Sequence, residues 1–273
     1  MRPRAEDCES RRDLNGMNAL TKPKAFDMKT ILLSLLLSLI VLCGCGNAHQ
    51  AVVERYFHSV GLLYTGDGVL APSFSCTYSA FERVPGGFNF VGAAHCLETH
   101  PKVVLIEDDS EGRVYKATLV AEGDQAKGYD FSVVRVSAPP GAFTIAPLGH
   151  NPRRISERVY TISSPLGIGR TYQEGTVSVL DIRSGVYVYD LVAPPHTYKH
   201  NLGVNILGLA PGSSGAAIMC LEQEAVCAIF VGILPGTMVA EPIKRFEQWW
   251  KNVQVGKEPR YQALRLSPLT KSL

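Results

Sequence analysis

Short runs of β-forming apolar residues repeat along most of this chain, and they restrict its possible folds more than any other feature. From about residue 52 to residue 236, turn-forming glycines, prolines and aspartates separate the runs. The expected strands are residues 59–64, 88–93, 103–106, 114–120, 131–136, 158–162, 176–182, 186–192, 216–220 and 227–233. Ten short strands at this spacing, with no helical period between them, predict an all-β protein built as a sandwich or as barrels.

One helix is expected near the C-terminus. Ile243, Phe246, Trp249 and Trp250 recur at helical spacing among charged and amide side chains. Such a stripe is typical of a helix that packs on a neighbouring surface, so we expect it to cover the β structure rather than to hold a cofactor. Residues 256–273 are interpreted as a polar tail.

Length and charge set the broad class. The 273 residues suffice for one large domain, and we expect residues 52–255 to form it. The formal net charge of +2 gives no electrostatic reason to expect a nucleic-acid partner.

Residues 28–45 are predicted to be a signal peptide. Their apolar run, residues 31–43, is shorter than the roughly 20 residues of a membrane-spanning helix and is typical of a signal-peptide core. Residues 1–27 are polar and mixed in charge, which is unusual in front of such a segment. We therefore expect translation to begin at Met28 or Met17, and residues 1–27 to form a non-functional extension.

The signal segment ends in Leu-Cys-Gly-Cys, which resembles the bacterial lipobox. The resemblance implies that Cys45 is lipidated, becomes the mature N-terminus and holds the protein at a membrane of the bacterial cell envelope, facing the periplasm or the outside. Two alternatives stay open: ordinary cleavage after Ala48, which would give a secreted protein, and an uncleaved anchor.

Three local motifs carry the chemistry. His95 follows an expected strand, Asp130 opens another, and Ser214 lies in a Pro-Gly-Ser-Ser-Gly-Ala turn before a third. A serine hydroxyl is a weak nucleophile unless an imidazole takes its proton, and a carboxylate must hold that imidazole in the correct tautomer. In this order along the chain, the three residues predict a catalytic triad of nucleophile Ser214, general base His95 and orienting Asp130.

The turn around Ser214 also suits an oxyanion hole. The backbone amides of Gly212 and Ser214 can point at one place, where they would stabilise a developing negative charge. Glycine is expected at 212 because a Cβ would hinder the required backbone conformation. Ser214, rather than Ser213, is the predicted nucleophile because it has a glycine two residues before it and another directly after it.

These segments resemble the trypsin-like peptidases, and among them the bacterial HtrA-type branch, over residues 55–252. The matching segments are 92–96 (the A-A-H-C box), 130–134, 211–216, 162–167 with 175–178, and 231–233. The resemblance implies a double six-stranded β-barrel with a C-terminal α-helix. It also implies a serine endopeptidase that cleaves polypeptides through an acyl-enzyme, and we expect neither a cofactor nor a metal.

The cysteines beyond the signal segment number four: Cys76, Cys96, Cys220 and Cys227. An even count behind an export signal indicates two disulfides, with three connectivities open. The resemblance implies the pairs Cys76–Cys96 and Cys220–Cys227, because a cysteine after the catalytic histidine pairs with the preceding strand in this family.

Departures from the family pattern bear on activation. Ser213 stands where many digestive-type relatives have an aspartate that pairs with a newly cut N-terminus, and no Ile-Val-Gly-Gly-like site precedes Ser59. We therefore expect activity without propeptide cleavage. Ala216 replaces a second glycine, which should leave the oxyanion donors intact. No PDZ-like domain is expected after the helix.

The specificity pocket is expected between residues 206–211 and 232–236. Neither segment contains Asp or Glu, which argues against a preference for Lys or Arg at the cleaved residue. We expect a preference for small or apolar side chains there instead. The expected substrate contacts are Gly208, Val231, Gly232 and Ile233. His196 and His200 are interpreted as surface histidines.

Two other functions are compatible with the same residues. A catalytically inactive trypsin-fold protein could serve in binding or scaffolding, although the intact triad argues against it. An acyl hydrolase acting on esters could use the same triad, but no segment specifically favours it.

Overall fold

The computed structural model describes residues 50–67, 72–97, 101, 103–108, 112–182, 186–187, 196–197, 200–234 and 236–258. The predicted extension, the signal segment with Cys45, and residues 259–273 of the predicted tail lie outside these described residues. Within the described part of the chain, no helix is both long and apolar enough to cross a membrane.

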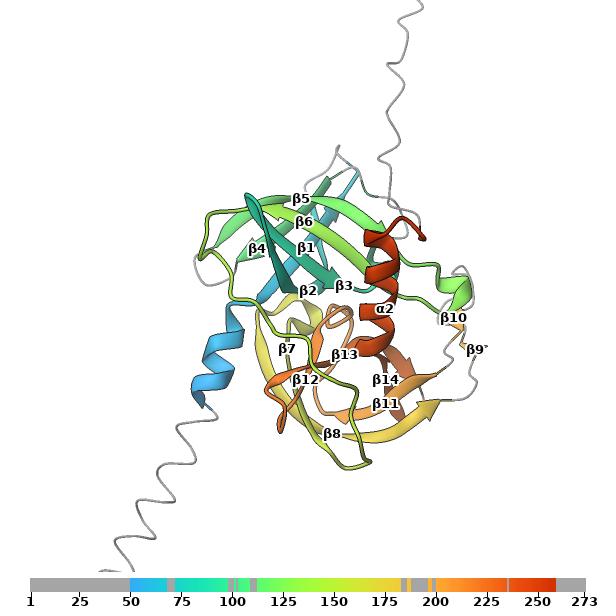
Figure 1. The fold of residues 1–273 in the computed structure, drawn as a ribbon. Helices are drawn as coiled ribbons and strands as arrows, with labels where there is room; N and C mark the ends of the chain where they lie inside the picture. The colour runs from blue at the N-terminus through green and yellow to red at the C-terminus, as the bar shows by residue number, and fades with distance from the viewer. Residues whose placement is uncertain are drawn as a thin grey trace, which may run out of the picture. The chain divides into compact units, whose positions relative to one another are not determined.

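The first half of the domain closes into a six-stranded antiparallel barrel (Figure 1). Its strands are β1 (Val60–Gly66), β2 (Ser73–Val84), β3 (Gly87–Gly92), β4 (Val103–Asp108), β5 (Arg113–Glu122) and β6 (Ser132–Ser137), in the order β1-β2-β3-β6-β5-β4. Side chains that alternate along the strands fill its interior, including Leu63, Tyr78, Phe90, Ile106 and Val134.

A second closed barrel follows, with the strand order β11-β14-β13-β12-β7-β8. Its strands are β7 (Arg158–Ser163), β8 (Thr171–Ile182), β11 (Asn201–Ile206), β12 (Ala217–Cys220), β13 (Ala225–Leu234) and β14 (Thr237–Pro242). A separate two-stranded pair is made by β9 (Val186–Tyr187) and β10 (His196–Thr197). The prediction of a double six-stranded barrel is confirmed.

The helix α2 (Ile243–Gln254) confirms the predicted C-terminal helix and lies alongside both barrels (Figure 1). The helix begins directly after β14 of the second barrel, and its apolar face packs against the first barrel. The ring of Phe246 lies edge-on to Phe81 at 5.1 Å and to Phe131 at 5.4 Å. The helix therefore fastens the two barrels together through aromatic contacts.

Four strands, namely β2, β10, β11 and β14, and one helix were not expected from the sequence. Strands β2, β11 and β14 contain polar or glycine residues among the apolar ones, so their apolar runs are short. Residues 50–57 form a helix that buries Val52 and Tyr56, four residues apart, against the core between the barrels. Pairing partners from distant parts of the chain, rather than local periodicity, make these segments regular.

Candidate active site

His95 and Asp130 are brought together by two neighbouring strands of the first barrel. β3 and β6 pair so that Gly92 is opposite Ser132, and the residues just beyond these ends therefore meet. The short 3₁₀ helix η1 (Ala94–Leu97) turns His95 toward the start of β6. The ring Nδ1 of His95 lies 2.7 Å from Oδ2 of Asp130, and the His95 amide donates to Oδ1 at 2.9 Å.

This contact determines what the imidazole can do. An ionised carboxylate only accepts hydrogen bonds, so the proton of a neutral His95 belongs on Nδ1 and Nε2 is left as the basic nitrogen. Asp130 is buried, with 5% of its surface exposed, while the His95 side chain keeps 23% exposed. The pair thus has the buried carboxylate and the accessible base that proton abstraction requires.

Ser214 lies in a turn between β11 and β12 that depends on two glycines. Gly212 and Gly215 both have positive φ, 96° and 84°. A Cβ at 212 would lie 2.5 Å from the Phe74 ring, and one at 215 would lie 2.5 Å from the Thr77 carbonyl oxygen. Both positions therefore require glycine, for backbone conformation and for space.

The peptide planes of this turn are fixed by hydrogen bonds to their carbonyls. The carbonyl of Pro211 accepts from the Leu166 amide at 2.7 Å, and that of Ser213 accepts from the Ala216 amide at 3.0 Å. In a trans peptide the N–H points opposite to the carbonyl, and none of the described peptide bonds is cis. The amides of Gly212 and Ser214 therefore point away from these partners, and neither donates to an acceptor among the described residues.

Thr77 on β2 of the first barrel holds the nucleophile turn of the second. Its amide donates to the Ser214 carbonyl at 3.0 Å, and its hydroxyl donates to the Gly212 carbonyl at 2.8 Å. The same hydroxyl accepts from the Ser164 amide at 3.1 Å. Sequence reasoning missed Thr77 because β2 itself was not predicted, and a lone threonine gives no local signal.

Ser213 begins a neutral hydrogen-bonded chain behind the turn. Its buried hydroxyl lies 3.1 Å from that of Ser163, which is 2.9 Å from Oε1 of Gln173. The Ser163 hydroxyl can donate to either of these acceptors, and the Ser213 hydroxyl also accepts from the Ala210 amide at 3.4 Å. The Gln173 amide then donates to the Gly208 carbonyl at 3.1 Å. The groups behind the nucleophile turn in this chain are thus neutral hydroxyls and an amide.

The predicted specificity residues lie beside this turn. On β13, Phe230 accepts from the Gly215 amide and donates to the Ala216 carbonyl, so Val231, Gly232 and Ile233 come directly after it. Gly208 lies in the turn after β11, and its neighbour Leu209 is buried in the apolar core of the second barrel. The two segments expected to line the pocket therefore flank Ser214 within one barrel.

Both predicted disulfides are present. Cys76 on β2 is bonded to Cys96, next to His95, and Cys220 is bonded to Cys227 across the β12–β13 hairpin. The sulfurs of Cys76 and Cys96 lie within 4.8 Å of a ring nitrogen of His95. Sulfurs joined in a disulfide cannot supply thiolate ligands, so this proximity follows from the bridge and does not indicate a metal centre.

Behind Asp130 lies a carboxyl that the sequence did not single out. Oε1 of Glu241, on β14, accepts from the Asp130 amide at 2.7 Å. Only 1% of Glu241 is exposed, and burial raises the pKa of its carboxyl to about 8, against the lowering effects of the Arg245 guanidinium and the Asp130 amide. Glu241 gave no signal in the sequence because it is 111 residues from its partner.

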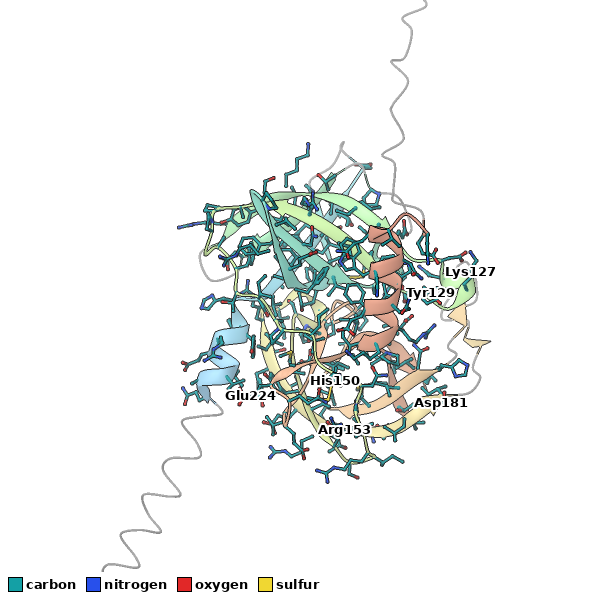
Figure 2. The ribbon with its side chains drawn as sticks, viewed as in Figure 1. Lys127, Tyr129, His150, Arg153, Asp181 and Glu224 are labelled. Carbon is teal, nitrogen blue, oxygen red and sulfur yellow. A yellow bond between two sulfur atoms is a disulfide. The ribbon has the colours of Figure 1, made fainter. Side chains whose placement is uncertain are left out.

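His200 lies at the surface, as expected, and its Nδ1 is 3.2 Å from the carboxylate of Asp181, which Figure 2 labels. Both side chains are well exposed, at 62% and 43%. The side chain of His196 lies outside the described residues.

Comparisons with known proteins bear on the family and the fold. A family described as "Trypsin-like peptidase domain" matches residues 83–229, which include His95, Asp130 and Ser214. Among solved structures, an HtrA-type protease, AlgW, in a variant with a tripeptide, matches with a TM-score of 0.60 and 18% identity. The match covers 77% of this chain and 64% of that one, so this chain spans less than two thirds of that protein's length.

No curated protein matches the chain. The family match covers just over half of the 273 residues, and the two closed barrels with their C-terminal helix give the chymotrypsin-like fold. The chain belongs to the trypsin-like peptidase family.

Proposed function

We propose that this protein is an active serine endopeptidase. Ser214 Oγ attacks the carbonyl carbon of the scissile peptide bond while Nε2 of His95 takes its proton. The oxyanion of the tetrahedral intermediate accepts hydrogen bonds from the backbone amides of Gly212 and Ser214. When the C–N bond breaks, His95 gives the proton to the leaving amine. Water, deprotonated by His95, then releases the acyl group from Ser214.

The observation that carries this proposal is the direction of the two amides at the nucleophile turn. Carbonyl hydrogen bonds to Leu166 and Ala216 keep the amides of Gly212 and Ser214 turned away from the protein's own acceptors. A buried or half-buried amide without an acceptor costs free energy. A protein used only for binding would gain nothing from this cost, whereas an oxyanion hole requires it.

For the substrate we propose polypeptides with a small or apolar side chain at the cleaved residue. Among the described pairings, β12 covers β13 only as far as Ile229, so residues 231–233 leave an edge on that side that an extended peptide can join. Gly208 and Gly232 leave room for the substrate, and Leu209 and Ile233 belong to the apolar core of this barrel. None of these residues supplies a negative charge for a lysine or arginine.

We also propose that the protein is exported and held at a membrane by a lipid on Cys45. This rests on the signal-like segment and its Leu-Cys-Gly-Cys end, as argued from the sequence. A Cys45→Ser variant should lose globomycin-sensitive processing and membrane association. Processing that is unchanged in this variant would instead favour cleavage after Ala48.

The test of catalysis is covalent labelling. A fluorophosphonate probe should label the full-length protein, and Ser214→Ala should abolish labelling, whereas Ser213→Ala should retain it. A correctly folded wild-type protein that stays unlabelled and cleaves no peptide in a mixed library would overturn the proposal in favour of a binding protein. Hydrolysis of simple esters without any peptide cleavage would favour an acyl hydrolase.

A further inference from the structure

Glu241 occupies an unusual place relative to the proposed triad. Within its own barrel, the Asp130 carbonyl accepts from the Ala94 amide at 3.3 Å, and its two carboxylate oxygens accept from His95. The Asp130 amide instead donates across to Oε1 of Glu241 at 2.7 Å. Glu241 lies on β14 of the second barrel, so this bond crosses from one barrel to the other.

Glu241 and the nucleophile turn share one rigid frame. Glu241 pairs with Ile229 on β13. The next residue, Phe230, exchanges hydrogen bonds of 2.8 and 2.9 Å with Gly215 and Ala216, directly after Ser214. The position of Glu241 relative to Ser214 is therefore fixed by adjacent sheet pairings, and its bond to Asp130 transfers that position to the other barrel.

Arg245 on α2 completes this arrangement. Oε2 of Glu241 has no hydrogen-bond partner among the described residues and lies 3.6 Å from the Arg245 guanidinium. Arg245 also donates to the Gly128 carbonyl at 2.7 Å and lies over the ring of Tyr129, beside α2 (Figure 2). Arg245 thus contacts Gly128 and Tyr129, the two residues before Asp130, while Glu241 bonds to Asp130 itself.

We propose that Glu241, supported by Arg245, is a positioning residue of the active site: it sets the place of Asp130, and through it of His95, relative to Ser214. The inference rests on the proposed function, since it explains how a base from one barrel stays within reach of a nucleophile from the other. A general base must lie within about 2.6–3.2 Å of the proton it takes, so small movements between the barrels are costly.

The charges that face Glu241 are those of Asp130 and Arg245. The carboxyl is largely protonated at neutral pH, because burial raises its pKa to about 8. Its ionisation at higher pH places a second anion behind Asp130, which stabilises the imidazolium that forms as His95 takes the proton. In the wild-type protein, kcat is therefore expected to rise further as the pH passes through about 8.

Two variants of the full-length protein separate the hydrogen bond from the charge. Glu241→Gln keeps an oxygen that accepts from Asp130, and Glu241→Leu removes it. We expect kcat to fall about tenfold or more in Glu241→Leu, with KM within about twofold of wild type, and to change by less than about threefold at pH 7 in Glu241→Gln. The matched control is Glu157→Gln, another buried carboxyl, which accepts from the Arg153 amide at 2.8 Å and should leave kcat unchanged.

A second measurement does not depend on catalysis. In protein labelled with ¹⁵N-histidine, the Nδ1 proton that His95 shares with Asp130 should give a far-downfield resonance in the wild type and in Glu241→Gln. It should broaden or shift upfield in Glu241→Leu. If the wild type hydrolyses nothing, the proposed endopeptidase function fails, while this resonance still tests the role of Glu241.

A folded Glu241→Leu protein with wild-type kcat and an unchanged His95 resonance would overturn the inference. If Glu241→Leu does not fold, Glu241→Gln decides through its pH profile. It should lack the rise in kcat near pH 8, and a profile identical to that of the wild type would equally overturn the inference.

Discussion

The two barrels contribute to the candidate site in different ways. The first supplies His95 and Asp130, which are held mainly by bonds to each other's side chains and backbone. The second supplies Ser214 in a turn whose function depends on backbone conformation, and that conformation is held by Thr77, Leu166 and two glycines. Side-chain identity thus builds one half of the site, and backbone geometry builds the other.

This difference has a consequence for how each half can fail. In the first barrel, replacing a single functional group is expected to remove the proposed chemistry and to leave the fold intact. In the second, residues without any reactive group can disable Ser214 by turning a peptide plane. Four substitutions test this contrast, and their expected losses of activity range from about 10³–10⁴ in kcat to less than about threefold.

Asp130→Asn should have the largest effect. The amide can no longer hold His95 in the productive tautomer, so kcat should fall by roughly 10³–10⁴. The melting temperature should change little, because the side chain keeps its size. Steady-state kinetics and thermal unfolding measure the two effects. Asp181→Asn, in an exposed carboxylate, is the control and should keep full activity. A loss below tenfold would show that Asp130 does not orient the base.

Gly212→Ala should break the second barrel's contribution. The new Cβ would lie 2.5 Å from the Phe74 ring and 2.7 Å from the Ser164 carbonyl oxygen, and φ of 96° disfavours any side chain. Displacing this amide should lower kcat by about 10²–10³ and also reduce stability. Gly141→Ala has a similar φ of 101° but open space around the Cβ, and it lies outside the expected specificity pocket, so it measures the backbone strain alone. Equal losses in both variants would argue against the steric explanation.

Thr77→Val tests whether the first barrel shapes the nucleophile turn. The variant loses the hydroxyl bonds to the Gly212 carbonyl and the Ser164 amide, but keeps its own amide bond to Ser214. We expect kcat to fall about tenfold. The free energy of unfolding, measured separately, should fall by about 1–3 kcal/mol. Thr161→Val, which breaks one buried hydroxyl bond to the Ala217 carbonyl, should lower stability but not kcat. Unaltered kcat in Thr77→Val would confine its role to folding.

Glu241→Gln should have the smallest effect on activity of the four variants. It should instead change how the stability of the protein depends on pH. Burial raises the pKa of Glu241 from 4.5 to about 8 in the folded state, so between these values the folded protein binds more protons than the unfolded chain. Its stability therefore falls as the pH rises through this range. Glu241→Gln lacks this loss and should gain melting temperature relative to wild type between pH 5 and pH 9. A difference that stays constant with pH would contradict the raised pKa.

Much of the fold was predictable because the strands with continuous apolar runs were visible locally. Strands β3, β6 and β13 are buried along most of their length, so nearly every residue in them had to be apolar or small. β2 mixes serine, threonine and charged residues with apolar ones. Its buried polar groups are satisfied by partners such as Gly212, which lies 135 residues from Thr77, and no local pattern can indicate such a partner.

Sequence analysis alone could identify the order of His95, Asp130 and Ser214, the glycines at 212 and 215, and the cysteines at 76, 96, 220 and 227. These are chemical identities, and each stands in a short segment that can be recognised alone. The folded chain was needed to see that Thr77 bonds to the nucleophile turn, that Gln173 bonds to the Gly208 carbonyl, and that Glu241 accepts from the Asp130 amide. The Gln173 contacts form because the second barrel closes, and those of Thr77 and Glu241 because the two barrels meet. Both events join residues that are far apart in the sequence.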